Sequence, residues 1–319
     1  MKNRYLAPLA IAITIAGCQP NTTTSEAVKV EQAAPVESTA NNPFFADYDT
    51  PYGIPPFDKI KKSDYLPAFY HGITQNKLEI AAITQLKSRP TFENTIVAME
   101  KSGDFLGKVS STFYGLTGSM SDDEIRAIAK EISPKLSALS DDIALNDALF
   151  KRVKEVYDNQ AQFDLRTDQK RLLEKTYKSF VRGGANLNDA DKLKLRELNE
   201  KLSGLSLKFG ENLLAETNNF EMVIDNKADL EGLPADIIAA ASETATTRGH
   251  EGKWVFTTHR PSKNPFLTYS SNRKLRETIY KGYTMRGNNE NANNNQAIAS
   301  ELASLRYQKA QLLGYKTHA

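Results

Sequence analysis

Apolar residues recur at steps of three and four along most of the chain, which is the spacing of one face of an α-helix. The longest such stretch is 189–217, where leucines and one phenylalanine follow Asn188, a residue that suits a helix N-cap. The same spacing is found in residues 63–87, 92–116, 121–133, 147–157, 168–181, 272–283 and 295–313. The pattern therefore predicts a mainly α-helical protein.

Local signals indicate where several of these helices begin and end. Ser121 and Glu124 have the spacing of a capping box, so we expect a helix to begin there and Pro134 to kink or end it. Asn146 is expected to cap the helix that follows it. The long leucine stripe of 189–217 predicts packing against a core rather than a ligand groove.

Two short segments depart from the helical spacing. Residues 220–225 partly alternate apolar and polar side chains, and residues 253–258 are β-branched and aromatic, so both predict strands. Between them Pro234 is expected to open a helix as its first residue. The predicted fold is thus a large multi-helix domain with a small β-α-β insertion.

The start of the chain predicts export. A positively charged beginning precedes the apolar residues 5–16, a run far shorter than the ~20 residues that cross a bilayer. It fits a secretory signal peptide. Residues 15–18 (IAGC) resemble the lipobox of bacterial lipoproteins, which predicts a signal peptide of residues 1–17 and a lipid on Cys18. The alternative is an ordinary signal peptide with an incidental cysteine.

The residues after Cys18 extend this prediction. Cys18 is the sole cysteine, so no intramolecular disulfide can form. Gln19 follows it, which by resemblance to lipoprotein sorting in Gram-negative bacteria favours the periplasmic face of the outer membrane. Residues 18–42 are polar and without period, and predict a disordered tether. The folded region would then be residues 43–319.

Composition narrows the function only slightly. The net charge is +2, with 41 basic and 39 acidic residues, so no strong overall field favours nucleic acid or an anionic membrane. The hydrophobic fraction of 40% and the charged fraction of 25% are those of an ordinary globular protein.

One His-Glu pair invites comparison with the zinc motif H-E-x-x-H. That motif places two histidines on one helical face, with the glutamate beside metal-bound water. Here the position four after His250 is Trp254, and the segment leads into a predicted strand, so we reject His250-Glu251 as such a motif. A ligand pair of His250 and His259 stays open, but it needs a third ligand that the sequence does not nominate.

Other polar residues have simpler explanations. His71 is expected to be a surface or packing residue, and His318 has no visible partner. The acidic pairs 122–123 and 141–142 are expected to stabilise helix starts through the helix dipole. The asparagine-rich residues 288–295 predict a solvated loop and a helix N-cap. Read in this way, the sequence contains no catalytic or metal-binding constellation.

Several short stretches nevertheless form a recognisable series. They are residues 55–58 (PPFD), 65–69 (YLPAF), 90–96 (PTFENTI), 132–136 (ISPKL), 180–187 (FVRGGANL), 209–214 (FGENLL), 252–255 (GKWV) and 312–315 (LLGY). In this order they resemble the bacterial dipeptidyl carboxypeptidase branch of the thimet-oligopeptidase-like zinc metallopeptidases. The resemblance covers nearly all of residues 43–319.

The resemblance implies the N-terminal lobe of a two-lobed, mostly helical enzyme with a deep channel. Such an enzyme releases C-terminal dipeptides from short peptides and holds one zinc ion with H-E-x-x-H and a later glutamate. The family's zinc motif lies downstream of the stretch that matches residues 312–315. No catalytic or metal residue can therefore be carried over, and we expect this chain alone to be inactive.

Two explanations account for a match to only part of such an enzyme. In the first, the chain is the N-terminal part of a peptidase of about twice its length, whose partners are short peptides and the missing catalytic region. In the second, it is a non-catalytic, lipid-anchored helical lipoprotein that binds peptides or another protein. A purely structural envelope lipoprotein is a third possibility. No nucleic-acid partner is expected, and membrane contact is expected through the lipid alone.

Overall fold

The computed structural model describes residues 41–118 and 120–319. The predicted signal peptide, Cys18 and nearly all of the predicted tether therefore lie outside the described residues. Asn42, which the sequence assigned to the tether, is already part of the fold. It is 7% exposed, its side-chain amide donates to the Asp64 carbonyl over 2.8 Å, and it caps the short 3₁₀ turn Pro43–Phe45. Asn42 is therefore part of the folded region that the structure describes.

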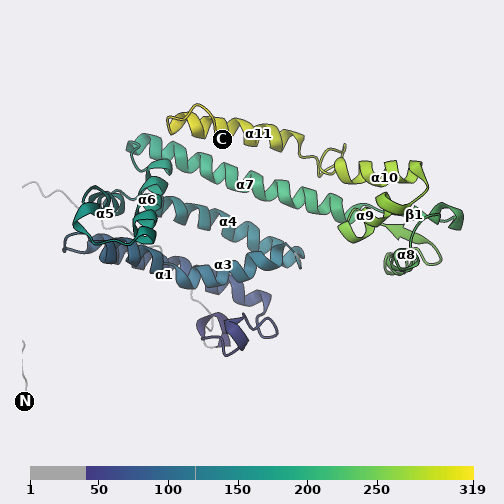
Figure 1. Ribbon diagram of the computed structural model, residues 1–319, viewed down its shortest axis with the longest axis horizontal. Coiled ribbons are helices and arrows are strands. Elements are labelled where there is room, and N and C mark those ends of the chain that lie inside the picture. The colour runs from purple at the N-terminus through teal and green to yellow at the C-terminus, as the bar shows by residue number, and fades with distance from the viewer. Residues whose placement is uncertain (1–40, 119) are drawn as a thin grey trace, which may run out of the picture. The chain divides into compact units, whose positions relative to one another are not determined.

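The described residues are mainly helical, which confirms the predicted fold class (Figure 1). The helices are α1 (Tyr65–Gln85), α2 (Ala98–Lys101), α3 (Asp104–Thr117), α4 (Asp123–Ala144), α5 (Asp147–Asp158), α6 (Thr167–Arg182), α7 (Asp189–Asn219), α8 (Ala235–Thr247), α9 (Arg260–Tyr269), α10 (Arg273–Thr284) and α11 (Gln296–Leu312). The strands are β1 (Met222–Ile224) and β2 (Trp254–Phe256). Among the described residues, no helix combines the length and hydrophobicity that crossing a membrane requires.

The region predicted as one helix over 92–116 is divided. It begins as a π-helical turn, Phe92–Val97, continues as α2 and restarts as α3. Gly103 lies between α2 and α3 with φ +79°, a left-handed conformation that glycine adopts without steric cost. Its amide donates to the Glu79 carboxylate over 2.7 Å. The apolar spacing continues across this break, so it does not reveal the turn.

Helix α4 differs from its prediction at three points. Its N-cap is Asp122 rather than Ser121, and the Asp122 carboxylate accepts the Ile125 amide over 3.0 Å. Pro134 lies inside the helix, which continues to Ala144, so it does not end there. The pair 141–142 lies in the last turn of α4 and not at a helix start, so its predicted dipole role is wrong.

Three other helices begin at asparagine N-caps. Asn146, Asn188 and Asn272 each accept a backbone amide three residues on, as predicted for the first two. Helix α9 was missed, because Pro261 and Pro265 fall within it and obscure the helical pattern.

The β-α-β insertion is confirmed. β1 and β2 pair antiparallel, with Val223 opposite Val255, and α8 lies between them in the chain. Pro234 is the N-cap of α8 rather than its first residue. A separate small core forms here, in which the rings of Phe256 and Phe266 lie 4.5 Å apart.

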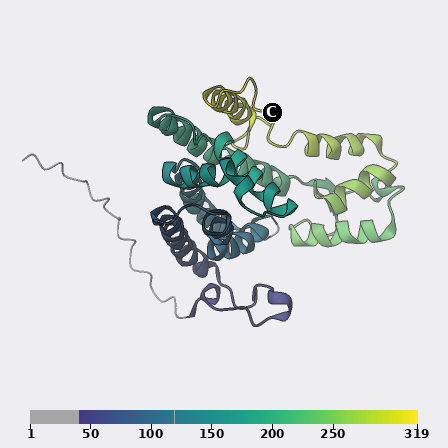
Figure 2. The same cartoon turned by 60° about the vertical axis from the view of Figure 1, so that its left-hand side comes forward.

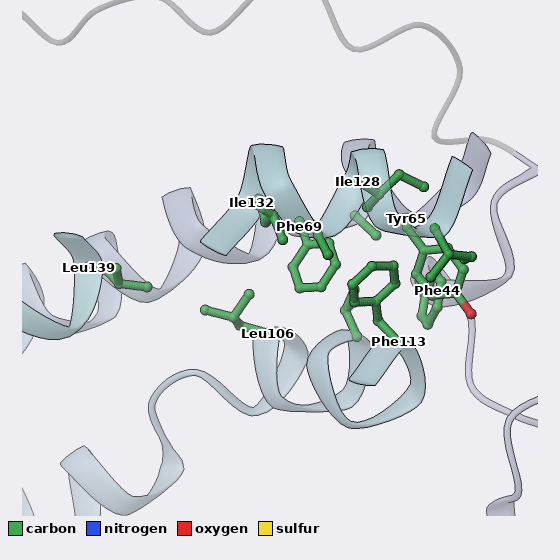
Figure 3. Close-up of a cluster of buried hydrophobic side chains, with 12 residues drawn as sticks. Phe44, Tyr65, Phe69, Leu106, Phe113, Ile128, Ile132 and Leu139 are labelled. Atoms are coloured by element: carbon green, nitrogen blue, oxygen red, sulfur yellow. The ribbon is translucent and has the colours of Figure 1, made fainter. Parts of the chain in front are cut away.

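Two larger cores lie between the helices that precede α7. The first joins α1, α3 and α4 around a cluster of aromatic rings (Figure 3). Phe113 is fully buried in it, with its ring 5.0 Å from that of Tyr65 and 5.4 Å from that of Phe69. The second core joins α1, α5, α6 and the π-helical turn, and includes Phe92, Leu149 and Leu173.

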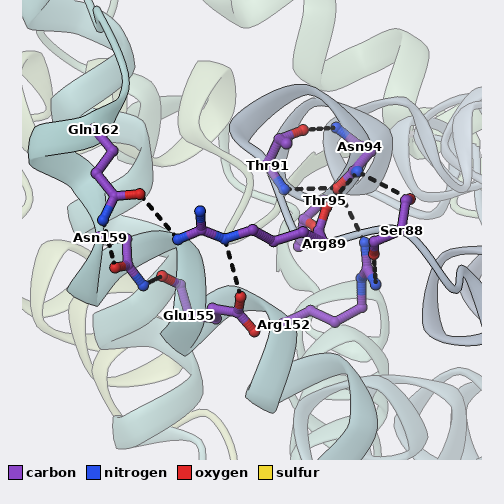
Figure 4. A network of polar contacts seen from close by, with 9 residues as sticks. All are labelled: Ser88, Arg89, Thr91, Asn94, Thr95, Arg152, Glu155, Asn159 and Gln162. Atoms are coloured by element: carbon purple, nitrogen blue, oxygen red, sulfur yellow. Dashed lines mark hydrogen bonds and ion pairs between the residues drawn. The ribbon is translucent and has the colours of Figure 1, made fainter.

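A buried arginine holds the start of the π-helical turn (Figure 4). Arg152 of α5 is 7% exposed and donates to the carbonyls of Leu86 and Ser88 over 3.2 and 3.3 Å. It also donates to the Asn94 side-chain oxygen over 3.0 Å, and Asn94 forms a capping box with Thr91. The stretch 90–96, which resembles the peptidase family, is thus a turn held in place by hydrogen bonds from the buried Arg152 of α5.

Helix α7 packs against α4 along one side and against α11 along another (Figures 1 and 2). The β-α-β insertion contacts its C-terminal end, where the Thr258 hydroxyl donates to the Thr217 carbonyl over 3.2 Å. Helix α7 therefore connects the helical cores with the insertion.

Candidate functional site

The apolar stripe of α7 is only half-buried. Of the nine apolar residues that define it, Leu195 alone is buried, and Leu193 is 64% exposed. The stripe packs against α4 and α11, but apart from Leu195 its residues are not fully buried. Periodicity identifies an apolar helix face, but it does not indicate whether the described part of the chain provides enough surface to cover that face.

Two hollows lie along the contact between α4 and α7. The first, of about 430 Å³, has an apolar floor that includes Ile125 of α4 together with Leu207 and Leu214 of α7. The second, of about 550 Å³, is lined mainly by serine hydroxyls and polar side chains of α4 and α7, with Lys309 of α11 at its edge. An apolar hollow next to polar groups is the usual composition of a ligand-binding surface.

The second hollow contains a chain of charged and polar groups. Lys309 donates to the Asn199 side-chain oxygen over 2.6 Å, and the Asn199 amide donates to the Asp141 carboxylate over 2.7 Å. Burial raises the pKa of Asp141 despite this hydrogen bond, and burial lowers the pKa of Lys309. The three residues come from α4, α7 and α11, so their proximity is not apparent from the sequence.

A buried carboxylate lies near the C-terminal end of α7. Glu216 is 9% exposed, and it accepts hydrogen bonds from the side-chain amides of Asn289 and Asn291. Burial alone would raise the pKa of Glu216, but the asparagine hydrogen bonds outweigh it and hold the pKa below its ordinary value.

The asparagine-rich segment is therefore not simply a solvated loop. Besides binding Glu216, it ends in Asn295, which is 4% exposed and accepts a hydrogen bond from Asn212 over 2.9 Å. Asn295 is the N-cap residue of α11 as predicted, although its side chain does not cap the helix. Instead this segment fixes the start of α11 on α7.

Replacing Glu216 with glutamine should lower the free energy of unfolding by about 1.5 kcal/mol at pH 7, because charge-assisted hydrogen bonds to a buried group are lost. The folded pKa lies below the unfolded one, so ionised Glu216 stabilises the fold above the unfolded pKa of about 4.3. This contribution is lost as the pH falls through the folded pKa. Urea unfolding at pH 7 and pH 3 should show a difference between wild type and variant that shrinks in acid. The exposed Glu200 of α7 is the control, and its glutamine variant should stay within about 0.5 kcal/mol of wild type.

The histidines do not form a metal site in the described part of the chain. His250 lies before β2, where its Nε2 is 2.9 Å from the Glu221 carboxylate. His259 instead lies 3.1 Å from the Thr257 hydroxyl, and His71 packs edge-on against Phe45 and Phe105. The exposed His318 lies beyond α11.

Zinc coordination requires three or four ligands converging on one point. Within residues 41–118 and 120–319, no group of three or more His, Cys, Asp or Glu side chains could hold a metal ion. The described residues thus do not fit a zinc centre, and no reaction step through zinc is assigned to them.

Comparison with known proteins finds that the chain is similar to several peptidases. The chain is similar to peptidases of the thimet oligopeptidase family. Dipeptidyl carboxypeptidase of Escherichia coli strain K12 is 36% identical to it over 281 residues, which cover 88% of this chain and 41% of that protein. The dipeptidyl carboxypeptidase of Salmonella typhimurium is 33% identical over 280 residues, with 88% and 41% covered. Oligopeptidase A of Escherichia coli is 27% identical over 274 residues, with 85% and 40% covered.

The match covers only part of each relative. The chain spans about two fifths of the length of these curated relatives, and a match of this length fits an N-terminal portion of such a peptidase. No family model matches the chain.

Proposed function

We propose that this chain forms the N-terminal, substrate-confining part of a zinc-dependent peptidyl-dipeptidase that releases C-terminal dipeptides from short peptides. The observation that carries the proposal is the 36% identity to a dipeptidyl carboxypeptidase over 88% of the chain. The alternative of a non-catalytic binding lipoprotein has no comparable support, since the three relatives described above are named as peptidases.

The half-buried face of α7 supports a role in confining peptides. An extended peptide presents apolar side chains and unpaired backbone groups, and it needs both kinds of partner on its binding surface. The two hollows between α4 and α7 offer an apolar floor and, further along, serine hydroxyls with Lys309. In this proposal the chain binds and orients peptide, while the bond-breaking groups lie outside residues 41–319.

The purified chain should therefore show no dipeptide release of its own. Incubation with a short N-blocked peptide and zinc, followed by chromatography of the products, tests this expectation. The dipeptidyl carboxypeptidase of Escherichia coli serves as the positive control. Zinc-dependent, chelator-sensitive release by the purified chain would show that its residues include a catalytic set.

Reading the gene past codon 319 tests the proposed enzyme itself. We expect an in-frame continuation that encodes H-E-x-x-H and a later glutamate. An in-frame stop with no such motif downstream would contradict the proposal.

We further propose that the protein is exported and held by a lipid on Cys18 at the periplasmic face of the outer membrane. The support is the lipobox-like stretch 15–18 and the glutamine that follows it. Replacing Cys18 with alanine should move the protein from the membrane fraction to the periplasmic extract. Equal membrane association of wild type and variant would count against the lipid anchor.

A further inference from the structure

The apolar hollow between α4 and α7 has a gap where a side chain could fit. Gly210 of α7 lines it, and a Cβ atom added to this glycine would meet no heavy atom within 4 Å. Leu207 and Leu214 flank the gap on the same helix, and Ile125 faces them from α4. The hollow of about 430 Å³ is within the size range of small-molecule binding sites.

One end of this hollow is cationic. Arg286 lines it, and its guanidinium donates to the Thr217 hydroxyl over 2.7 Å and to the Tyr283 carbonyl over 2.9 Å. A guanidinium has five N–H donors, so three remain for a ligand. Among the described residues Arg286 forms no ion pair with a carboxylate.

A second cation strengthens the positive character of this end. The Lys263 ammonium lies over the Tyr283 ring, 3.3 Å from its centroid, and the Arg286 guanidinium lies 4.0 Å from the same centroid. Lys263 is 8% exposed and also forms no ion pair within the described part of the chain. The neighbouring Glu216 carboxylate already accepts two asparagine amides. This end of the hollow therefore favours an anionic group.

An acidic side chain lies further along the hollow, about midway along the residues of α7 that line it. Glu211 lines the same hollow and forms no ion pair among the described residues. Arg126 also lines the hollow, but it is paired with the Asp123 carboxylate. Glu211 is therefore available to a cationic group.

The spacing of the two charged groups sets the length of the ligand. Glu211 and Thr217, the partner of Arg286, are six residues apart on α7, which corresponds to about 9 Å along the helix axis. An extended peptide spans about 3.3–3.6 Å per residue, so two or three residues cover this distance.

We propose that the hollow between α4 and α7 is a binding site for an apolar peptide of two or three residues with both termini free. Glu211 receives the N-terminal ammonium, Arg286 receives the C-terminal carboxylate, and the apolar floor receives the side chains. The site is assigned by its own geometry. Its biological meaning rests on the proposed function, because a peptidyl-dipeptidase releases free dipeptides that such a site would retain or sense.

Isothermal titration of the full chain with leucyl-leucine tests the site. Gly210→Leu would fill the hollow, and we expect it to weaken binding at least about tenfold, since the peptide and the new side chain compete for one volume. Gly204→Leu is the matched control. Gly204 also lies on α7 with no heavy atom near an added Cβ, but it does not line the hollow. Both variants should fold, because leucine favours a helix more than glycine does.

Blocked peptides test the two ends separately. Leucyl-leucine amide lacks the carboxylate and N-acetyl-leucyl-leucine lacks the ammonium, and each should bind about tenfold more weakly than the free dipeptide. Arg286→Gln should abolish the discrimination between acid and amide. Glu211→Gln should abolish the discrimination between free and acetylated peptide.

Three results would overturn the proposal: no binding to the wild-type chain, equal binding by the Gly210 and Gly204 variants, or equal affinity for the acid and the amide. None of them would affect the continuation of the gene past codon 319, which tests the proposed function. Conversely, an in-frame stop there would remove the product role and leave the peptide site standing.

Discussion

Replacing Phe113 with alanine is expected to lower the free energy of unfolding by about 4 kcal/mol, the largest loss we predict for a single substitution in this chain. Phe113 is fully buried, and its ring contacts those of Tyr65 and Phe69 (Figure 3). Truncation removes the apolar surface that it buries and leaves a cavity between α1, α3 and α4 that rigid helices fill only partly. Urea unfolding followed by circular dichroism measures the loss.

Two further variants show whether the loss comes from this cavity. Phe113→Leu keeps most of the volume and should fall between wild type and alanine. Phe57 is 50% exposed, so Phe57→Ala should cost less than about 1 kcal/mol. If Phe113→Ala were no more destabilising than Phe57→Ala, this aromatic cluster would not be a core that stabilises the chain.

Replacing Arg152 with alanine is expected to cost about 3 kcal/mol, although no carboxylate pairs with this arginine among the described residues. The variant leaves the carbonyls of Leu86 and Ser88 without this donor. It also removes one of the three donors to the Asn94 side-chain oxygen, which still accepts from the Thr91 amide and the Thr95 hydroxyl (Figure 4). Thermal and urea unfolding measure the change. The expected value is a net one, because removing a buried guanidinium also recovers part of its desolvation cost.

Arg89 provides the matched control for Arg152. It belongs to the same polar network but is largely exposed, where it donates to the Gln162 side chain over 2.9 Å and pairs with Glu155 at 3.5 Å (Figure 4). Exposed pairs of this kind stabilise little, so Arg89→Ala should stay within about 0.5 kcal/mol of wild type. Equal losses in the two variants would mean that burial of the Arg152 donors is not what holds the turn.

The half-buried face of α7 distinguishes this region from an ordinary helical core. Its leucines pack in part against α4 and α11, yet Gly210 opens onto a hollow instead of closing it. Contiguous apolar surface of this kind commonly marks a binding site. This face carries two of the proposed roles, confining peptide substrates and holding a short peptide with free ends.

Much of the secondary structure was predictable because its causes are local. The asparagine caps at 146 and 188 act within one helical turn, and the apolar spacing of α4 buries Ile125, Ile128 and Ile132 as expected. One miss occurred where a tertiary contact accompanies a break in the local pattern: Gly103 interrupts a continuous apolar pattern, and its amide donates to Glu79. Pro134, expected to kink or end its helix, lies inside α4, which continues to Ala144.

The candidate site was far less predictable than the helices. Asp141, Asn199 and Lys309 are brought together from three helices, and Arg286 reaches Thr217 across 69 positions in the chain. Each is an ordinary polar residue within its own segment. The asparagine-rich segment was noticeable in the sequence, but its partner Glu216 was not, because the contact is set by how α11 begins on α7.

By itself the sequence determined the helical class, the β-α-β insertion and the likeness to a peptidase family, because caps, apolar spacing and short motifs are properties of neighbouring residues. The sequence also showed that His250 lacks the spacing of the zinc motif H-E-x-x-H, because Trp254 stands where the second histidine would be. Only the tertiary structure decided that the leucine face of α7 is half-buried and that Glu211 and Arg286 line the same apolar hollow. Burial and convergence depend on which helices pack together, and packing is a property of distant residues.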